Sequence, residues 1–467
     1  MPLLEMPTEI LSLIVENLPV KDLCSVARAS KRLSGVIQTP LYRFIELKWD
    51  EKNSYPIATL LATLLKRPQL ARKVRNLVCR GNDYCVCGRI TCKGRPPPVK
   101  IDDEQISIFE HAAGRYGVYF CEYWIHQLRA REIDAVFALL LAQLKGLRSL
   151  TLDANFGPRW QSLTGEVIHM SMCDRPIGGN KKLPKFDQLR KVRFLGASPA
   201  GRTSYAAHDA LPFILAPRID EFQAPLHVCT LLRRCFTGCS TTSSLTSLTL
   251  GSFVEEDKLG EVLAMAPNVK SLNWAWSPTA NNWGMNFTKL LESLSLVRDT
   301  LTELRIVTII PELSDFQPYV LLDFKGDLSG LADFNLTKLQ LPLEVLLDNF
   351  IRLETPLHAI IPQTTEVLKV IEDRLIQAPL VLPDDMVFSA LIRFVKSVPY
   401  SHPSLRHLML EEMFDQDEHR DEVLGDVDFR DEEIWTAIRE ECQEVGLEYS
   451  YSDQEIRNVF AGDTMDW

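Results

Sequence analysis

Thiols and imidazoles gather in one stretch of this 467-residue sequence, and together they could hold a zinc ion. Thiolate sulfur and imidazole nitrogen are ligands that zinc prefers. The candidates are Cys85, Cys87 and Cys92, followed by His111, Cys121 and His126. The Cys-x-Cys spacing is tighter than the usual two to four intervening residues, and no second close pair completes a set of four. An exposed cysteine-rich loop is the favoured interpretation, and no metal or other cofactor is expected.

The remaining polar residues form no recognisable catalytic pattern. The sequence has no Gly-rich phosphate loop, no His-Glu-x-x-His and no Gly-x-Ser-x-Gly. His402 and His407 lie beside a predicted strand and are expected at the surface, and the pair Asp384-Asp385 has no evident partner. A looser cysteine group is expected to serve as small apolar packing: Cys229, Cys235 and Cys239. We therefore expect a non-catalytic protein.

Composition indicates the broad class of protein to which the chain belongs. With 46% hydrophobic and 24% charged residues, the chain resembles an ordinary soluble protein. No apolar run approaches the ~18 to 20 residues that a membrane span requires. No secretory signal is expected, so the eleven cysteines are interpreted as reduced thiols of the cytoplasm or nucleus.

The charge is unevenly distributed along the chain. Residues 411–467 hold twenty acidic and four basic side chains, a net charge of −16. Residues 1–410 carry 47 basic and 42 acidic side chains, a net of +5. No basic stripe with interleaved aromatic residues is present, so nucleic acid is not an expected partner.

Short amphipathic segments punctuated by proline occupy the first fifty residues. Pro7 is suited to the start of the first helix, because the first helical N–H groups have no partner. Pro19 ends that helix and starts the second, and Ser30 suits the N-cap of a third that is expected to end before Pro40. Apolar residues at helical spacing mark each segment: Ile10, Leu11, Ile14 and Leu18, then Leu23, Val26 and Ala27, then Leu33, Val36 and Ile37.

This pattern resembles an F-box. The matching stretches are Met6-Pro7-x-Glu9-Ile10, Ile14, Leu18-Pro19, Asp22-Leu23, Ser30-Lys31-Arg32-Leu33 and Leu41-Tyr42. Leu33 stands where many F-boxes have tryptophan. The resemblance implies docking onto the Skp-type adaptor of a cullin–RING ubiquitin ligase; an ordinary helical hairpin is the alternative. The implied adaptor contacts are Met6, Pro7, Ile10, Ile14, Leu18, Pro19, Leu23, Leu33 and Leu41.

A phrase of the form apolar-x-x-apolar-x-apolar recurs through the rest of the chain. Its middle residues are Leu77, Leu150, Val192, Phe222, Leu248, Leu272, Leu304, Leu339, Leu368 and Leu408. Each phrase predicts a short strand after a helix, and a unit this small must stack on neighbours to cover its apolar face. The phrases resemble degenerate leucine-rich repeats of fungal-type F-box proteins. Separate α/β domains with parallel sheets are the alternative.

These observations predict an α/β chain with a small all-α start and a parallel-stranded, irregular repeat solenoid. The expected parts are an F-box (1–47), a helical linker (48–69), a client-binding repeat domain (70–412), an acidic linker (413–433) and a C-terminal helix and tail (434–467). Loops are expected at 81–100, 153–186 and 196–208. Three tryptophans that follow a repeat strand are candidate client contacts: Trp274, Trp276 and Trp283.

The expected function is that of a substrate receptor in an SCF-type (Skp–cullin–F-box) ubiquitin ligase. Its expected partners are the Skp-type adaptor, cullin through that adaptor, and an unidentified client protein, with no membrane. An interaction scaffold that uses the adaptor outside a ligase stays open as an alternative.

Overall fold

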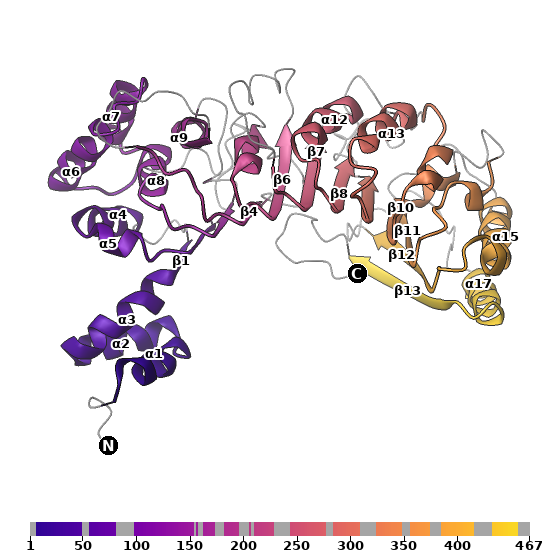
Figure 1. Ribbon diagram of the computed structural model, residues 1–467, viewed down its shortest axis with the longest axis horizontal. Coiled ribbons are helices and arrows are strands. Elements are labelled where there is room, and N and C mark those ends of the chain that lie inside the picture. The colour runs from indigo at the N-terminus through magenta and orange to yellow at the C-terminus, as the bar shows by residue number, and fades with distance from the viewer. Residues whose placement is uncertain are drawn as a thin grey trace, which may run out of the picture. The chain divides into compact units, whose positions relative to one another are not determined.

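Parallel strands and the helices between them make up most of the structure, a computed structural model (Figure 1). The described residues are 6–48, 56–80, 98–153, 156, 162–172, 182–195, 205–206, 210–227, 243–276, 284–308, 324–347, 355–373, 384–414 and 432–455. Trp283 and the cysteines at 85, 87, 92, 229, 235 and 239 lie outside them, as do most of the loop predicted at 81–100 and nearly all of the acidic linker.

The chain divides into two units, each with its own packing. Unit 1 holds residues 1–197, 205–222 and 233–244; unit 2 holds 198–204, 223–232 and 245–467. The helices of unit 1 are α1 (Thr8–Glu16), α2 (Val20–Ala29), α3 (Lys31–Arg43), α4 (Pro56–Lys66), α5 (Pro68–Ala71), α6 (Asp103–Gly114), α7 (Cys121–Arg129), α8 (Ile133–Leu141), α9 (Leu163–Met172) and η2 (Leu211–Leu215). Its strands are β1 (Phe44–Lys48), β2 (Asn76–Arg80), β3 (Ser149–Leu152), β4 (Lys191–Phe194) and β5 (Tyr205–Ala206); β6 (Glu221–His227) begins in unit 1 and ends in unit 2.

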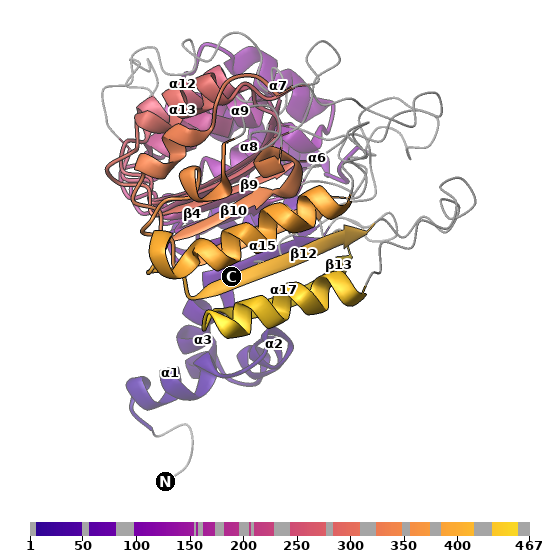
Figure 2. The same cartoon turned by 90° about the vertical axis from the view of Figure 1, so that its right-hand side faces the viewer.

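Unit 2 continues the alternation of strand and helix. Its strands are β7 (Ser247–Phe253), β8 (Ser271–Trp276), β9 (Glu303–Thr308), β10 (Lys338–Pro342), β11 (Val367–Asp373), β12 (His407–Phe414) and β13 (Glu448–Glu455). Its helices are α12 (Glu256–Met265), α13 (Phe287–Ser295), η3 (Ser329–Asp333), η4 (Leu357–Ala359), α15 (Asp384–Ser401) and α17 (Glu432–Glu444). Figure 2 shows α15 and α17 beside β12 and β13.

The recurring phrases form the predicted strands and stack in register. Every middle residue of the ten phrases lies in a strand and is at most 1% exposed. In unit 1, Leu77 pairs with Leu150, which pairs with Val192. In unit 2, one apolar ladder runs through Leu248, Leu272, Leu304, Leu339, Leu368 and Leu408. This confirms the prediction of an α/β, solenoid-like chain with parallel strands after a helical start.

The other side of the strands in unit 2 carries a polar row. Side chains alternate along a strand, so the residues after the ladder leucines face away from them. Arg305 lies in register between Asn273 and Gln340, and Gln340 pairs with Lys369. Lys369 Nζ lies 2.5 Å from Glu411 Oε2, with the two side chains 7% and 3% exposed. A buried ion pair therefore lies on the polar side of these strands.

Two strands, β1 and β13, were not predicted and lie before and after the ten predicted strands in the sequence. β1 begins directly after α3 and pairs in parallel with β2, so Phe44 to Lys48 belong to a strand where the sequence indicated the end of the F-box. The predicted C-terminal helix is present as α17 and stops before Gly446, whose φ of 74° suits glycine. The chain then adds β13, which pairs with β12 and was not predicted.

The loop predicted at 153–186 is wrong in its middle, because α9 forms there. Ser162 Oγ accepts a hydrogen bond from the Gly165 N–H at 2.9 Å. Asp134 reaches over from α8, and its carboxylate accepts from the N–H groups of Leu163 and Thr164 at 2.6 and 3.1 Å. These contacts satisfy N–H groups that a helix start leaves without partners. The loop prediction rested on the local glycine and serine content. It failed because Asp134, which is distant in the sequence, stabilises the start of the helix.

Candidate docking surface

Three helices at the start of the chain form the candidate site, and the sequence sets where each begins. Pro7 and Pro19 are the N-caps of α1 and α2, as predicted. Ser30 is the N-cap of α3 in extended conformation, although its side chain makes no capping hydrogen bond. Pro40 lies inside α3, which runs on to Arg43, so the predicted stop before Pro40 is wrong.

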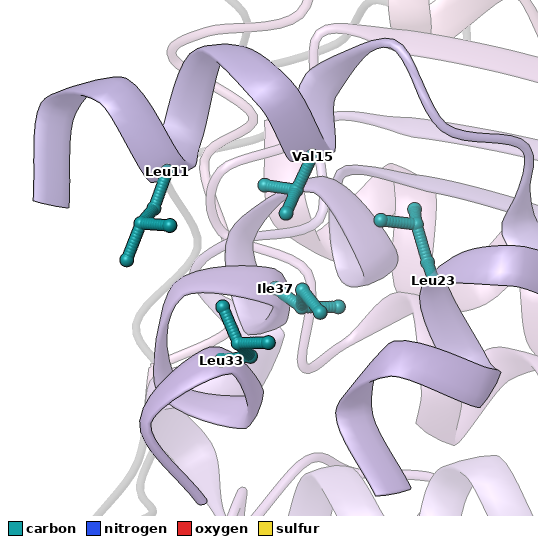
Figure 3. Close-up of a cluster of buried hydrophobic side chains, with 5 residues drawn as sticks. All are labelled: Leu11, Val15, Leu23, Leu33 and Ile37. Atoms are coloured by element: carbon teal, nitrogen blue, oxygen red, sulfur yellow. The ribbon is translucent and has the colours of Figure 1, made fainter. Parts of the chain in front are cut away.

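A small apolar core holds these helices together (Figure 3). Its buried side chains come from all three helices: Leu11, Val15, Leu23, Leu33 and Ile37. Partly buried neighbours complete it: Met6, Leu18, Val26, Ala27, Val36 and Leu41. Arg32 adds a polar tie, because its Nη2 donates to the Met6 carbonyl oxygen at 2.9 Å. The helices therefore form a packed unit with leucine rather than tryptophan at position 33.

The same helices expose a second set of large apolar side chains. Ile10, Leu13 and Ile14 of α1 are 43%, 60% and 41% exposed, and Val20 at the start of α2 is 56% exposed. Residues three and four apart lie on one side of a helix, so the first three share one face. That face is distinct from the one through which Leu11 and Val15 enter the core. An apolar helix face in water is suited to burial against a partner.

The predicted adaptor contacts fall into three groups by exposure. Ile10, Ile14, Pro7 and Pro19 are exposed and offer surface. The half-buried contacts are Met6, Leu18 and Leu41, which also pack on the core. Leu23 and Leu33 are only 3% and 6% exposed, so in this structure their contacts are with the other two helices. The exposed Leu13 and Val20 were missed, although Leu13 lies three residues after Ile10, a helical spacing that was a usable signal.

Trp274 and Trp276, proposed from the sequence as client contacts, lie inside unit 2. They are 0% and 3% exposed, and Trp274 pairs in register with Leu250 and Ile306. Their burial argues against direct contact with a client and gives them the role of core side chains.

The described members of the candidate zinc set do not assemble into a site. His111 belongs to α6, whereas Cys121 and His126 belong to α7. Burial and the nearby Glu122 carboxylate raise the pKa of the Cys121 thiol, which disfavours the thiolate that zinc binds. Within the described ranges, no three such side chains come together as metal ligands.

His402 is buried, so its predicted surface position is wrong. Its Nε2 lies 2.8 Å from the Ile361 carbonyl oxygen, to which it donates, and its Nδ1 lies 2.8 Å from Ser401 Oγ. Burial, together with the nearby His358, lowers the pKa of His402 from its ordinary 6.5. The neutral imidazole is thus part of the packing around α15.

Protonation of His402 is expected to destabilise the fold. Because its pKa is lowered in the folded state, the unfolded chain binds more protons near pH 6. The stabilisation is complete above the unfolded pKa of 6.5 and is lost as the pH falls below it. Urea unfolding from pH 7.5 to 5.0 should show a falling free energy of unfolding, with a shallower fall for His402→Gln. Equal slopes in both proteins would contradict this assignment.

No helix in the part of the chain that the structure describes is long and apolar enough to cross a membrane.

Comparison with known families supports the resemblance at the N-terminus. Residues 3–48 match the family model described as F-box-like. The match covers α1, α2 and α3 and ends at the last residue of β1. Comparison with curated proteins finds none that matches this chain.

Proposed function

We propose that this chain is the substrate-recognition subunit of an SCF-type E3 ubiquitin ligase. One observation carries the proposal: the segment that matches the F-box-like family also exposes Ile10, Leu13, Ile14 and Val20. F-box domains generally bind Skp-type adaptors. An exposed apolar helix face beside a packed core is suited to an adaptor groove.

The chain's contribution to ubiquitin transfer would be proximity. The N-terminal helices bind the adaptor and, through it, cullin, while the stacked strands and their connections hold a client protein. Holding a client lysine near the ubiquitin thioester raises the effective concentration of the two reacting groups. In this proposal the chain supplies no catalytic residue of its own. Its proposed location is the cytoplasm or nucleus.

The client-binding part is proposed to be a degenerate leucine-rich-repeat-like domain. The apolar ladders of units 1 and 2 support this, because each strand lies in register with its neighbour and connections emerge at the strand ends. Connections on such a scaffold are common positions for binding residues.

Co-purification with purified partners tests the proposal. The full chain, co-expressed with a Skp-type adaptor, should carry both the adaptor and an added cullin through size-exclusion chromatography as one complex. Recovery of the adaptor without cullin would indicate an interaction scaffold that acts outside a ligase. If the adaptor itself does not bind, the proposed function is wrong.

A further inference from the structure

A cavity of about 290 Å³ opens among the helices of unit 1, away from the N-terminal three. It lies where the ends of α4, α5 and α8 approach one side of α6. Its apolar lining includes Leu65, Ala71, Ile108, Ala112 and Ala142. Its volume is enough for one large apolar side chain and lies at the lower end of the range for ligand pockets, which usually start near 300 Å³.

Three of the polar side chains that line the cavity are cationic. Arg72, Arg115 and Lys145 line the cavity together with His111, and all four are exposed. Among the described residues that line it, none is acidic. Three permanent positive charges around one opening create a local positive potential that attracts anions.

The acidic residues of neighbouring α6 are engaged elsewhere. Glu104 pairs with Lys66 at 3.2 Å, and Glu110 pairs with Arg129 of α7 at 2.7 Å. Asp103 lies 3.9 Å from Arg131. Within the described ranges, no carboxylate forms an ion pair with Arg72, Arg115 or Lys145, so these cations have charge to offer a partner.

Buried and partly buried hydrogen bonds connect two walls of the cavity. Tyr116 OH, next to Arg115, donates to the Ala142 carbonyl oxygen at 2.9 Å. Gln143 Nε2 donates to Tyr116 OH and to the Leu139 carbonyl oxygen, both at 3.0 Å. These bonds join the end of α6 to the end of α8, so Arg115 and Lys145 lie beside a fixed contact.

We propose that this cavity is a client-binding site for an acidic peptide segment with one large apolar side chain. The apolar side chain enters the cavity, and flanking carboxylates pair with Arg72, Arg115 and Lys145. This inference rests on the proposed function, because it assigns a surface to the client of a substrate receptor. The charge of the opening and the apolar lining favour this ligand over a free anion, which would leave the cavity unfilled.

Fluorescence anisotropy with a synthetic probe tests the site on the complex of the full chain with its adaptor. The probe is fluorescein-labelled Glu-Glu-Leu-Glu-Glu, compared with Gln-Gln-Leu-Gln-Gln and Glu-Glu-Ser-Glu-Glu. The test variant is Arg72→Gln with Arg115→Gln and Lys145→Gln. The control, Lys100→Gln with Arg148→Gln and Lys182→Gln, removes the same charge from exposed positions of unit 1 outside the cavity.

The acidic leucine probe should bind the unchanged complex and lose about tenfold or more affinity in the test variant. The control variant should keep its affinity, and both comparison peptides should bind more weakly. An equal loss of probe affinity in the test and control variants would show that net charge alone causes the effect, and would overturn the site. Absence of probe binding to the unchanged complex would also overturn it. Equal binding of the serine peptide would overturn the apolar anchor. Co-elution of the adaptor in the same samples reports on the proposed function separately.

Each of the three cations also lies at or just beyond a helix C-terminus, where positive charge stabilises a helix. Thermal unfolding of both variants separates that role from binding. A purely structural role predicts a lower melting temperature in the test variant with unchanged probe affinity, and this result would overturn the proposal.

Discussion

Replacing Ile10 and Ile14 together by glutamate is expected to abolish co-purification of the adaptor. Both side chains are more than 40% exposed on one face of α1 and do not belong to the buried core. In a complex, the change would remove about 1.5–3 kcal/mol of apolar burial for each side chain and bury unpaired carboxylates. We therefore expect the affinity for the adaptor to fall by more than about a hundredfold. Isothermal titration with purified adaptor measures it.

A matched control separates docking from general surface change. Leu296→Glu with Tyr400→Glu adds the same two charges at exposed apolar positions of unit 2, where the side chains are 49% and 91% exposed. This control should bind the adaptor normally, and both double variants should keep the helical circular dichroism of the unchanged chain. Normal affinity of the Ile10/Ile14 variant would place the docking face elsewhere on the three helices.

Breaking the buried ion pair of unit 2 is expected to have the largest effect on stability. Lys369→Met removes the ammonium group 2.5 Å from the Glu411 carboxylate, which is 3% exposed, and leaves Arg305 as a favourable charge nearby. Removing one member of a buried pair typically costs about 3–5 kcal/mol, because the remaining charge stays desolvated. Urea unfolding followed by tryptophan fluorescence should report a loss of this size.

Two further variants test the cause of that loss. Lys369→Met with Glu411→Leu removes both charges and should recover part of the stability, since an apolar pair can replace a buried ion pair, although buried Arg305 then loses the favourable Glu411 charge. Arg129→Met breaks the exposed pair with Glu110, in which arginine is 66% exposed, and should change stability far less. If the double variant is as unstable as Lys369→Met, the unpaired Glu411 carboxylate is not the cause of the loss.

The strand ladder was predictable from the sequence because its signal is local and repeated. Two apolar residues spaced two apart specify one face of a strand, and neighbouring strands such as those of Leu304 and Leu339 carry the same phrase. The proline-marked starts of α1 and α2 were predictable for a similar reason, since proline restricts its own backbone and that of the preceding residue.

The orientation of α1 was not predictable in the same way. Apolar residues occupy nearly every position from Ile10 to Val15, so periodicity alone cannot tell which face enters the core. Packing decides it: Leu11 and Val15 meet α2 and α3, and Ile10 and Ile14 remain outside. The candidate site therefore needed the structure to divide core residues from exposed ones.

Distant partners explain other errors. His402 is buried because the Ile361 carbonyl oxygen, 41 residues earlier, satisfies its ring. The helix α9 begins where Asp134, 29 residues before Leu163, accepts from its first N–H groups. Neither contact can be predicted from the residues next to it in the sequence.

The in-register ladder allows the chain to change length without disturbing its scaffold. Leu77 and Leu150 are 73 residues apart and Leu248 and Leu272 only 24, yet both pairs lie side by side in neighbouring strands. The longer connection is accommodated because it folds into helices of its own, α6, α7 and α8, which pack against one another. Insertions and deletions can thus lengthen or shorten the connections during evolution, while the hydrogen-bonded frame and the F-box-like segment stay as they are.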